Sequence, residues 1–380
     1  MNVLFIPHIP TMSGRRYQLS KHLVLLGHNV YFVLWSQPYP FSLSNIKDNI
    51  LNSIKSYSFK KDGITFVKIA RIPLVFPIIN GYLFKKQIRK IYEEKNIDII
   101  ISQSFTNETE QPLDLPYIYD INDYHYGFAE VYGSWLYKIS YKLLGVRKTV
   151  DRQIKNAKHV IAVSDYLMKY AKKLNKNTTK ITNGVDQVFL KEKNKPEENI
   201  NKHSLIYVGN FGKWSMLEEI VLAIKNLKDE YPNILLTIVG DGPALKQAKE
   251  DVINFGLSKQ IKFTGWIKDR KKILELIKSS EICINISEEN VFRIAASPIK
   301  FFEYAALGKK IISTKLPEIT KLNYPYAFYL DGSTVNNLAE TIKTAMNIKL
   351  PENNKWLRRN EFSWINLSKQ LVNIIERTKS

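Results

Sequence analysis

Short apolar runs alternate with segments of helical periodicity along most of the chain, and this alternation is the feature that most constrains the fold. The run at 2–6 is continuous, as in a parallel strand covered on both faces, and the helical pattern after it closes on Gly27, a common C-cap residue. The same reasoning predicts a helix at 164–174 and further strands at 30–35, 97–102, 117–121 and 159–164. Strands that alternate with helices in this way indicate a doubly wound parallel sheet.

The alternation starts again behind a polar and charged segment at 191–203, which has the composition of a linker. The second set of predicted strands lies at 204–209, 234–240, 261–265, 281–287 and 309–314. We therefore predict an α/β protein with two Rossmann-like domains that face a cleft. The first domain would comprise 1–192 together with a C-terminal helix at 362–380 that packs back onto it, and the second would comprise 193–361.

Composition limits the class of protein and its partners. The chain has 380 residues, of which 44% are hydrophobic, and a formal net charge of +20. Such a charge indicates an anionic partner, namely nucleic acid, a phosphorylated small molecule or a membrane surface, unless it reflects only a lysine-rich codon bias. The one cysteine, Cys283, lies in an apolar run and is expected in a core. No apolar run is long enough to span a membrane and the start does not resemble a signal peptide, so a cytoplasmic protein is expected.

The segment Ser297–Lys300 follows a predicted strand and begins a predicted helix. Ser297 suits the N-cap and Pro298 the first helical position, so the first free N–H groups would form an anion site. Lys300 adds a positive charge, and Glu303 follows three residues later on roughly the same face. A cation with backbone amides suits a diphosphate, and a carboxylate suits a vicinal diol such as a ribose. The alternative is a solvent-exposed Lys–Glu pair of little energetic weight.

Motifs in both halves resemble those of a family 4 glycosyltransferase of the GT-B fold. The matching stretches are VLFIPHIP with SGRR, LLGHNVYFV, DINDY, AKHVIAVSDYL and KITNGVD in the first half, and LIYVGNFGKW, LTIVGDGP, IKFTGWI and SPIKFFEYAALGKKIIST in the second. Their order over nearly the whole chain is more specific than any single glycine loop, and the form SPxKxxEY is typical of a subset of the family. The resemblance implies transfer of a sugar from a UDP- or GDP-sugar to an acceptor hydroxyl.

The resemblance also implies roles for particular residues. Glu303 would bind the ribose of the donor, and the helix start formed by Ser297, Pro298, Ile299 and Lys300 would hold its diphosphate. The remaining donor contacts would come from Gly14 and Arg15 of the first domain, Asn210 and Lys213 after the first strand of the second, and Trp266 and Ile267 beside the base.

Three positions depart from the pattern of the family. Ala295 stands where many members carry a second glutamate, Asn210 where many carry an arginine, and Asn122 where a histidine often precedes the aspartate. We predict that Arg293 occupies the space left at Ala295. We interpret these departures as divergence of a subfamily rather than loss of activity.

No Asp-x-Asp motif is present, so we predict no metal and no other cofactor. Cations such as Lys213 and the helix N-terminus would stabilise the leaving diphosphate. A retaining reaction needs no strong base, whereas an inverting one needs a carboxylate or a histidine. Asp120, Asp123 and His125 follow a predicted strand and are the candidates, unless the two aspartates are only turn and cap residues. Retention is favoured, although the missing glutamate weakens that analogy.

Two basic and aromatic segments, 71–92 and 125–148, have the composition of an interfacial helix on an anionic membrane. The alternative for each is an ordinary buried helix with a basic solvent face. The expected acceptor is a glycan or a lipid-linked glycan. A nucleic-acid-binding protein is a competing class, but no recognition-helix, zinc-ligand or RNP-type motif supports it. A nucleotide-sugar epimerase or hydrolase of the same fold is a second alternative.

Overall fold

The computed structural model describes residues 1–35, 53–72, 77–143, 145–191, 200–332, 334–351 and 356–379. The chain divides into two compact units, unit 1 with Met1–Thr182 and Trp364–Ser380, and unit 2 with Asn183–Ser363. The division falls before the predicted boundary at 192 because Val185 and Phe189 pack into a core of unit 2. Residues 192–199 of the predicted linker lie outside the described residues, and its last part, from Asn201, already belongs to a strand.

Unit 1 contains an eight-stranded sheet, counted over the described residues, in the order β3-β4-β2-β1-β5-β6-β7-β8. Its strands are β1 (Asn2–Ile6), β2 (Asn29–Leu34), β3 (Tyr57–Lys61), β4 (Ile64–Lys68), β5 (Ile99–Ser102), β6 (Tyr117–Ile121), β7 (His159–Ala162) and β8 (Thr178–Lys180). Its helices are α1 (Gly14–Leu25), α3 (Pro77–Glu94), α4 (His125–Tyr132), α5 (Trp135–Leu143), α6 (Val146–Asn156), α7 (Asp165–Lys172) and α16 (Trp364–Lys379). The strands predicted in this half are all present.

The hairpin of β3 and β4 is an element that the predicted alternation missed. The two strands pair antiparallel, whereas the other strand pairs of this sheet are parallel. The turn between them is Asp62-Gly63, and both residues have positive φ, 49° and 74°. An Asp-Gly pair between alternating strands is a strong hairpin signal, because both turn positions require the left-handed region. The sequence therefore carried this information.

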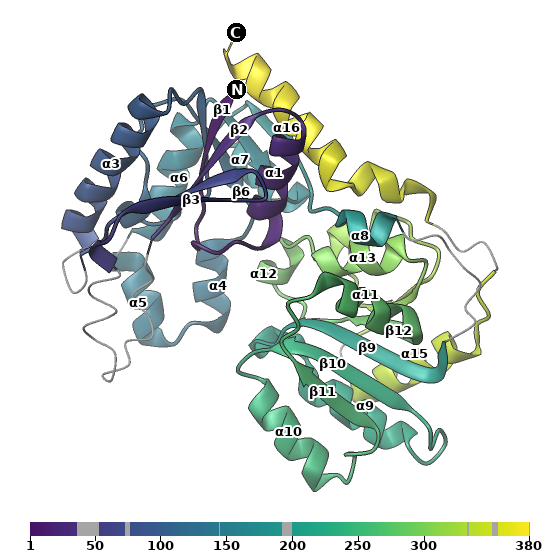
Figure 1. Ribbon diagram of the computed structural model, residues 1–380. Coiled ribbons are helices and arrows are strands. Elements are labelled where there is room, and N and C mark those ends of the chain that lie inside the picture. Colours follow the sequence, from purple (N-terminus) through teal and green to yellow (C-terminus); the bar gives the residue numbers. More distant parts are fainter. Residues whose placement is uncertain are drawn as a thin grey trace. The chain divides into compact units, whose positions relative to one another are not determined.

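The C-terminal helix α16 returns to unit 1, as predicted. Leu367, Leu371 and Ile375 are buried, and the helix lies against α1, beside which it is drawn in Figure 1. At its end the Lys379 ammonium lies 2.6 Å from a carboxylate oxygen of Asp98. The buried apolar side chains of α16 thus hold the last segment of the sequence against unit 1, where it contacts α1.

Unit 2 contains a six-stranded parallel sheet among its described residues, in the order β11-β10-β9-β12-β13-β14. Its strands are β9 (Asn201–Asn210), β10 (Leu235–Asp241), β11 (Ile261–Gly265), β12 (Ser280–Asn285), β13 (Lys310–Ser313) and β14 (Ala327–Tyr329). Its helices are α8 (Gln187–Leu190), α9 (Leu217–Leu227), α10 (Leu245–Asn254), α11 (Arg270–Ser279), α12 (Val291–Ile294), α13 (Ile299–Ala306), α14 (Pro317–Thr320) and α15 (Val335–Asn347). The predicted alternation did not include β14 and α15.

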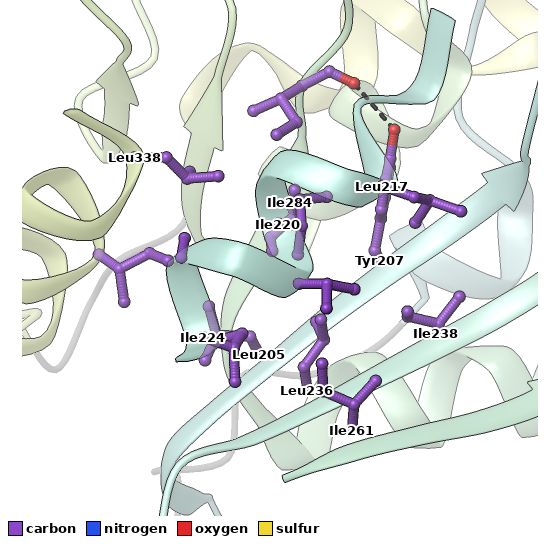
Figure 2. Packing of buried hydrophobic residues seen from close by; sticks show 14 of the residues in the cluster. Leu205, Tyr207, Leu217, Ile220, Ile224, Leu236, Ile238, Ile261, Ile284 and Leu338 are labelled. Carbon is purple, nitrogen blue, oxygen red and sulfur yellow. Dashed lines mark hydrogen bonds between the residues drawn. The ribbon is translucent and has the colours of Figure 1, made fainter. Parts of the chain in front are cut away.

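Aliphatic side chains fill the layer between the sheet of unit 2 and its helices. Figure 2 shows Leu205 and Leu236 of the sheet near Ile224 of α9, and fully buried side chains of this size stabilise a fold by about 1.5–3 kcal/mol each. Tyr207 is the polar exception, and its hydroxyl lies 2.8 Å from the carbonyl oxygen of Ile286. Cys283 is buried in the second cluster of this unit, as predicted.

The strand order reverses once in each sheet, and these points determine where ligands can bind. In unit 1 the order reverses between β1 and β5, and in unit 2 between β9 and β12. In open α/β sheets, ligands bind beyond the carboxyl ends of the strands at such a reversal, because the flanking helices leave to opposite faces there.

Candidate functional site

Lys300 lies at the reversal point of unit 2, on the first turn of α13. Its Nζ lies 4.0 Å from the centre of the Tyr207 ring of β9, and the side chain is half-buried. Burial lowers the pKa of the Lys300 ammonium well below its usual value, and Arg293 acts in the same direction. No carboxylate of the described residues forms an ion pair with Lys300. The site therefore holds a cation that a bound anion would stabilise.

The surroundings of this ammonium leave little freedom. The Tyr207 hydroxyl lies within hydrogen-bond distance of two backbone carbonyl oxygens, those of Ser215 and Ile286, at 3.0 and 2.8 Å. On another side, a Cβ atom added at Gly209 would lie 3.6 Å from the Lys300 Nζ. The VGN loop thus lies in contact distance of the cation on one side, and the Tyr207 ring, held by its hydroxyl, lies on the other.

Glu303 is buried on the next turn of α13, and its partner is Arg270 of α11. Burial raises the pKa of the Glu303 carboxyl, and the charge of Arg270 acts in the opposite direction. The Arg270 guanidinium also lies 4.8 Å from the centre of the Phe189 ring and 3.9 Å from a carboxylate oxygen of Asp186. A solvent-exposed Lys300–Glu303 pair, the alternative interpretation, is therefore wrong.

The helix begins one residue later than predicted. Pro298 is the N-cap with extended dihedral angles, φ −70° and ψ 114°, and α13 starts at Ile299. Ser297 is thus not the N-cap, and its carbonyl oxygen accepts a hydrogen bond of 2.6 Å from the Asn183 side chain. The correction keeps Lys300 in the first turn, close to the positive end of the helix dipole.

Two glycine loops of unit 2 interlock at the same edge of the sheet. The Phe211 N–H donates to the carbonyl oxygen of Asp241, and the Phe211 carbonyl accepts from Ala244. Gly240 and Gly242 have φ of 135° and 149°, and an added Cβ would lie 1.8 Å and 2.4 Å from backbone oxygens. Both positions therefore require glycine for close packing of the two loops.

The other residues predicted on the donor side differ in exposure. Asn210 and Lys213 are exposed, Trp266 is 70% exposed, and Ile267 packs against the second core cluster. Ala295 is buried, and Arg293 is half-buried on α12 and near enough to affect the pKa of Lys300. Arg293 thus lies near Lys300 and two residues before Ala295, the position where many family members carry a glutamate.

In unit 1 the structure joins two residues that the sequence analysis placed in different roles. The Nε of Arg15 lies 3.1 and 3.0 Å from the two carboxylate oxygens of Asp120, and both side chains are buried. Asp120 also accepts a hydrogen bond of 2.7 Å from Gln103, and the Nη1 of Arg15 donates to the carbonyl oxygen of Thr182. This pair stands at the edge of the sheet where β6 ends.

His125 stacks on Phe105 with ring centres 4.3 Å apart, and its ring centre lies 5.1 Å from that of His8. Burial lowers the pKa of His125 to about 3 and holds the pKa of His8 well below its usual value. Both rings are thus neutral at neutral pH. His8 was not predicted, although its position directly after the first strand placed it at the same sheet edge as Asp120 and Asp123.

Two Rossmann-like units, each with a parallel sheet whose strand order reverses once, define the GT-B class of fold, and the second unit carries Lys300 and Glu303 on α13. Family models match almost the whole chain, Glycosyltransferase Family 4 over residues 16–188 and Glycosyl transferases group 1 over 188–362. The chain belongs to the family 4-like glycosyltransferases.

Relatives and solved structures agree with this family. An uncharacterised glycosyltransferase of Methanocaldococcus jannaschii is 28% identical over 192 residues, which cover 47% of this chain and 46% of that protein. The match thus spans about half the length of that curated relative. Sucrose-phosphate synthase of Thermosynechococcus elongatus, with TM-score 0.69 and 15% identity, covers 99% of this chain and 98% of its own. Anabaena HepE in complex with UDP-glucose has TM-score 0.69 and 15% identity, with 99% and 100% coverage. At such identities the two structures show the shared fold.

Proposed function

We propose that this glycosyltransferase transfers a hexosyl group from a nucleoside diphosphate sugar to an acceptor hydroxyl. Unit 2 holds the donor, with the Lys300 ammonium on the diphosphate and the Glu303 carboxylate on the ribose. The observation that carries the proposal is the Lys300 ammonium, which rests on the Tyr207 ring at the sheet reversal without a carboxylate partner among the described residues. The solved complex of HepE with UDP-glucose supports a nucleotide sugar as the donor class.

A second part of the proposal concerns the chemistry of transfer. Cations and the α13 N-terminus stabilise the leaving diphosphate without a metal, and retention at the sugar is favoured. Among the described residues, no group of three His, Cys, Asp or Glu side chains is placed to hold a metal ion. If inversion occurs, Asp120 is a poor base candidate because its carboxylate is paired with the buried Arg15, and Asp123 is the carboxylate that we propose as the base.

The first experiment is a binding and turnover screen with UDP-, GDP- and other nucleotide sugars. We expect calorimetry to show binding of UDP or GDP, and we expect Glu303→Ala to weaken it about tenfold, the effect of one hydrogen bond to a charged group. Lys262→Met, a change of an exposed residue at the start of β11, is the control. Transfer to an acceptor should persist in EDTA. An unchanged dissociation constant in Glu303→Ala would contradict the donor assignment, and release of free sugar without an acceptor would favour a hydrolase.

The acceptor side of the proposal includes an anionic membrane surface. The structure distinguishes the two predicted segments, because α3 buries Phe84, Ile88 and Ile91 whereas α5 exposes its apolar side chains. Trp135 is 69% and Leu143 81% exposed, beside exposed lysines of the same helix. Residues 73–76 and 144 of the segments lie outside the described residues, and no helix that the structure describes is long and apolar enough to cross a membrane. We propose that α5 lies in the membrane–water interface, so that the enzyme can bind a lipid-linked acceptor there.

Vesicle binding tests this surface. At low salt the protein should bind phosphatidylglycerol vesicles, and Trp135→Ser with Leu143→Ser should weaken binding at least about tenfold, since each lost apolar side chain removes about 1.5–3 kcal/mol of burial. Tyr82→Ser, which changes an exposed aromatic residue on α3, should leave binding unchanged. If the wild-type protein does not bind such vesicles, the membrane proposal is wrong, and the proposal for the donor site is unaffected.

A further inference from the structure

The first turn of α1 carries two adjacent arginines at the reversal point of the unit 1 sheet. Arg15 and Arg16 are 4% and 8% exposed, and this turn contains no acidic residue. The N-terminus of a helix is its positive end, so cations in the first turn are unfavourable there. Burial of a charge without a counter-ion adds to that free energy. Two buried cations at this place therefore require anions nearby.

Asp120 provides the anion for Arg15, but no carboxylate among the described residues forms an equivalent ion pair with Arg16. Its Nη2 donates to the Thr11 hydroxyl at 2.6 Å, and its Nη1 lies 3.4 Å from the His8 Nδ1. The buried Nε has no hydrogen-bond partner among the residues that the structure describes. Burial lowers the pKa of Arg16 to about 10, and Asp123 and Asp120 act in the opposite direction. Arg16 thus remains charged at neutral pH, with unused donor capacity.

The loop in front of α1 carries two hydroxyl groups, those of Thr11 and Ser13, between Arg16 and the solvent. Because the Thr11 oxygen accepts from Arg16, its own proton is available to another acceptor, and the Ser13 oxygen lies 3.3 Å away. Ser13 is the N-cap residue of α1, yet its side chain makes no capping hydrogen bond. The hydroxyl groups can therefore donate to a ligand, as can the first N–H groups of the helix.

This loop is also accessible. Thr11, Ser13 and Gly14 are exposed, and a Cβ added at Gly14 would meet no atom within 4 Å. Gly14 has φ 71°, so glycine is favoured there for its backbone conformation while the space beside it stays open. An oxyanion could reach the hydroxyl groups and the helix N-terminus from this side, with the Arg16 guanidinium beneath the loop.

We propose that Thr11, Ser13 and the α1 N-terminus, backed by Arg16, bind an oxyanion carried by the acceptor, either a phosphate or a carboxylate. The residues lie in unit 1, whereas the donor proposal uses Lys300 and Glu303 of unit 2. The inference rests on the proposed function only where it assigns the anion to the acceptor. Asp123, whose charge acts on Arg16, is the adjacent base candidate, so an anion here would place an acceptor hydroxyl within its neighbourhood.

The test uses inorganic pyrophosphate and glucuronate as phosphate and carboxylate probes, titrated by calorimetry at constant ionic strength with UDP saturating. We expect one probe to bind to the wild-type protein in the presence of UDP. Ser13→Ala and Arg16→Gln should each weaken it about tenfold, the effect of one hydrogen bond to a charged group. Lys21→Gln, which removes the same charge further along α1, should have no effect. Ser13 is exposed, so its variant remains informative even if Arg16→Gln fails to fold.

The outcomes separate this inference from the donor proposal. Absence of any probe binding to the UDP-loaded protein would overturn the anion site. A tenfold weaker affinity for UDP in Ser13→Ala would assign the loop to the donor and overturn the acceptor role. If UDP itself does not bind, the donor proposal fails, and the probe titration is then made without UDP, where Ser13→Ala still decides the anion site.

Discussion

Replacing Lys300 by methionine should lower the affinity for UDP-glucose, or for the nucleotide sugar that the screen selects, about 100-fold. Methionine keeps an unbranched apolar stem that is one atom shorter, so the Tyr207 ring stays largely covered and the fold should persist. What is lost is the charge that we place on the diphosphate, and truncation of one partner of a desolvated, hydrogen-bonded charge pair costs about 2–5 kcal/mol. Calorimetry measures the dissociation constant, with Lys262→Met as the matched control.

The pH dependence of the same affinity gives a sharper test. The pKa of Lys300 is lowered in the free protein and would be raised by a bound diphosphate. Below the pKa of the free protein the ammonium is charged in both states and affinity is highest. As pH rises through that value, binding must take up a proton, and affinity should fall by up to about tenfold per pH unit. Lys300→Met should bind weakly at every pH. A wild-type profile that stays flat over the whole pH range in which the protein is folded would contradict the assignment.

Replacing Asp120 by asparagine should destabilise unit 1 strongly. The change leaves the Arg15 guanidinium buried without its counter-ion, and breaking a buried ion pair costs about 3–5 kcal/mol. For a domain of this size that corresponds to a fall in Tm of about 10 °C. Differential scanning calorimetry measures the transition, and Arg15→Met with Asp120→Leu, which removes both charges, should recover part of the loss.

The control for this prediction is Asp114→Asn, which breaks the exposed ion pair with Arg89. Exposed pairs contribute little, so its Tm should be close to that of the wild type. If Asp120→Asn unfolds no earlier than Asp114→Asn, the Arg15 pair is not a structural element. A stable Asp120→Asn variant that has lost glycosyl transfer would instead make Asp120 the base of an inverting reaction.

Periodicity predicted most of the fold because the apolar pattern is strong and local. Runs such as 2–6 and 117–121 became the strands β1 and β6 with those bounds. The misses have physical reasons. The hairpin around Asp62 was missed because β3 has no buried residue and therefore no apolar run, although its Asp-Gly turn was a signal. Strand β14 has only three residues, too few for a periodic signal. Ser297 suited the N-cap in sequence, but Pro298 adopts extended angles and is itself the N-cap, so the helix starts at Ile299.

The candidate site was predicted less completely, because partners distant in sequence do not appear in a motif. Lys300 and Glu303 were selected from their spacing and their resemblance to the family. Their actual neighbours are Tyr207 and Arg270, 93 and 33 residues away in the chain by numbering. Arg15 and Asp120 were assigned to a donor contact and a base, and only the fold shows that they neutralise each other.

By itself the sequence determined the two alternating α/β units, the return of the C-terminal helix and the family, because these follow from local periodicity and from the order of motifs. Tertiary structure alone decided which charges are paired. A buried carboxylate such as Asp120 or Glu303 acquires its partner from the strand or helix beside it, and that neighbour is set by the order of strands in the sheet. The same packing left Lys300 over a ring and Arg16 beneath a loop of hydroxyl groups, which is why the proposed binding sites could be located only in the folded chain.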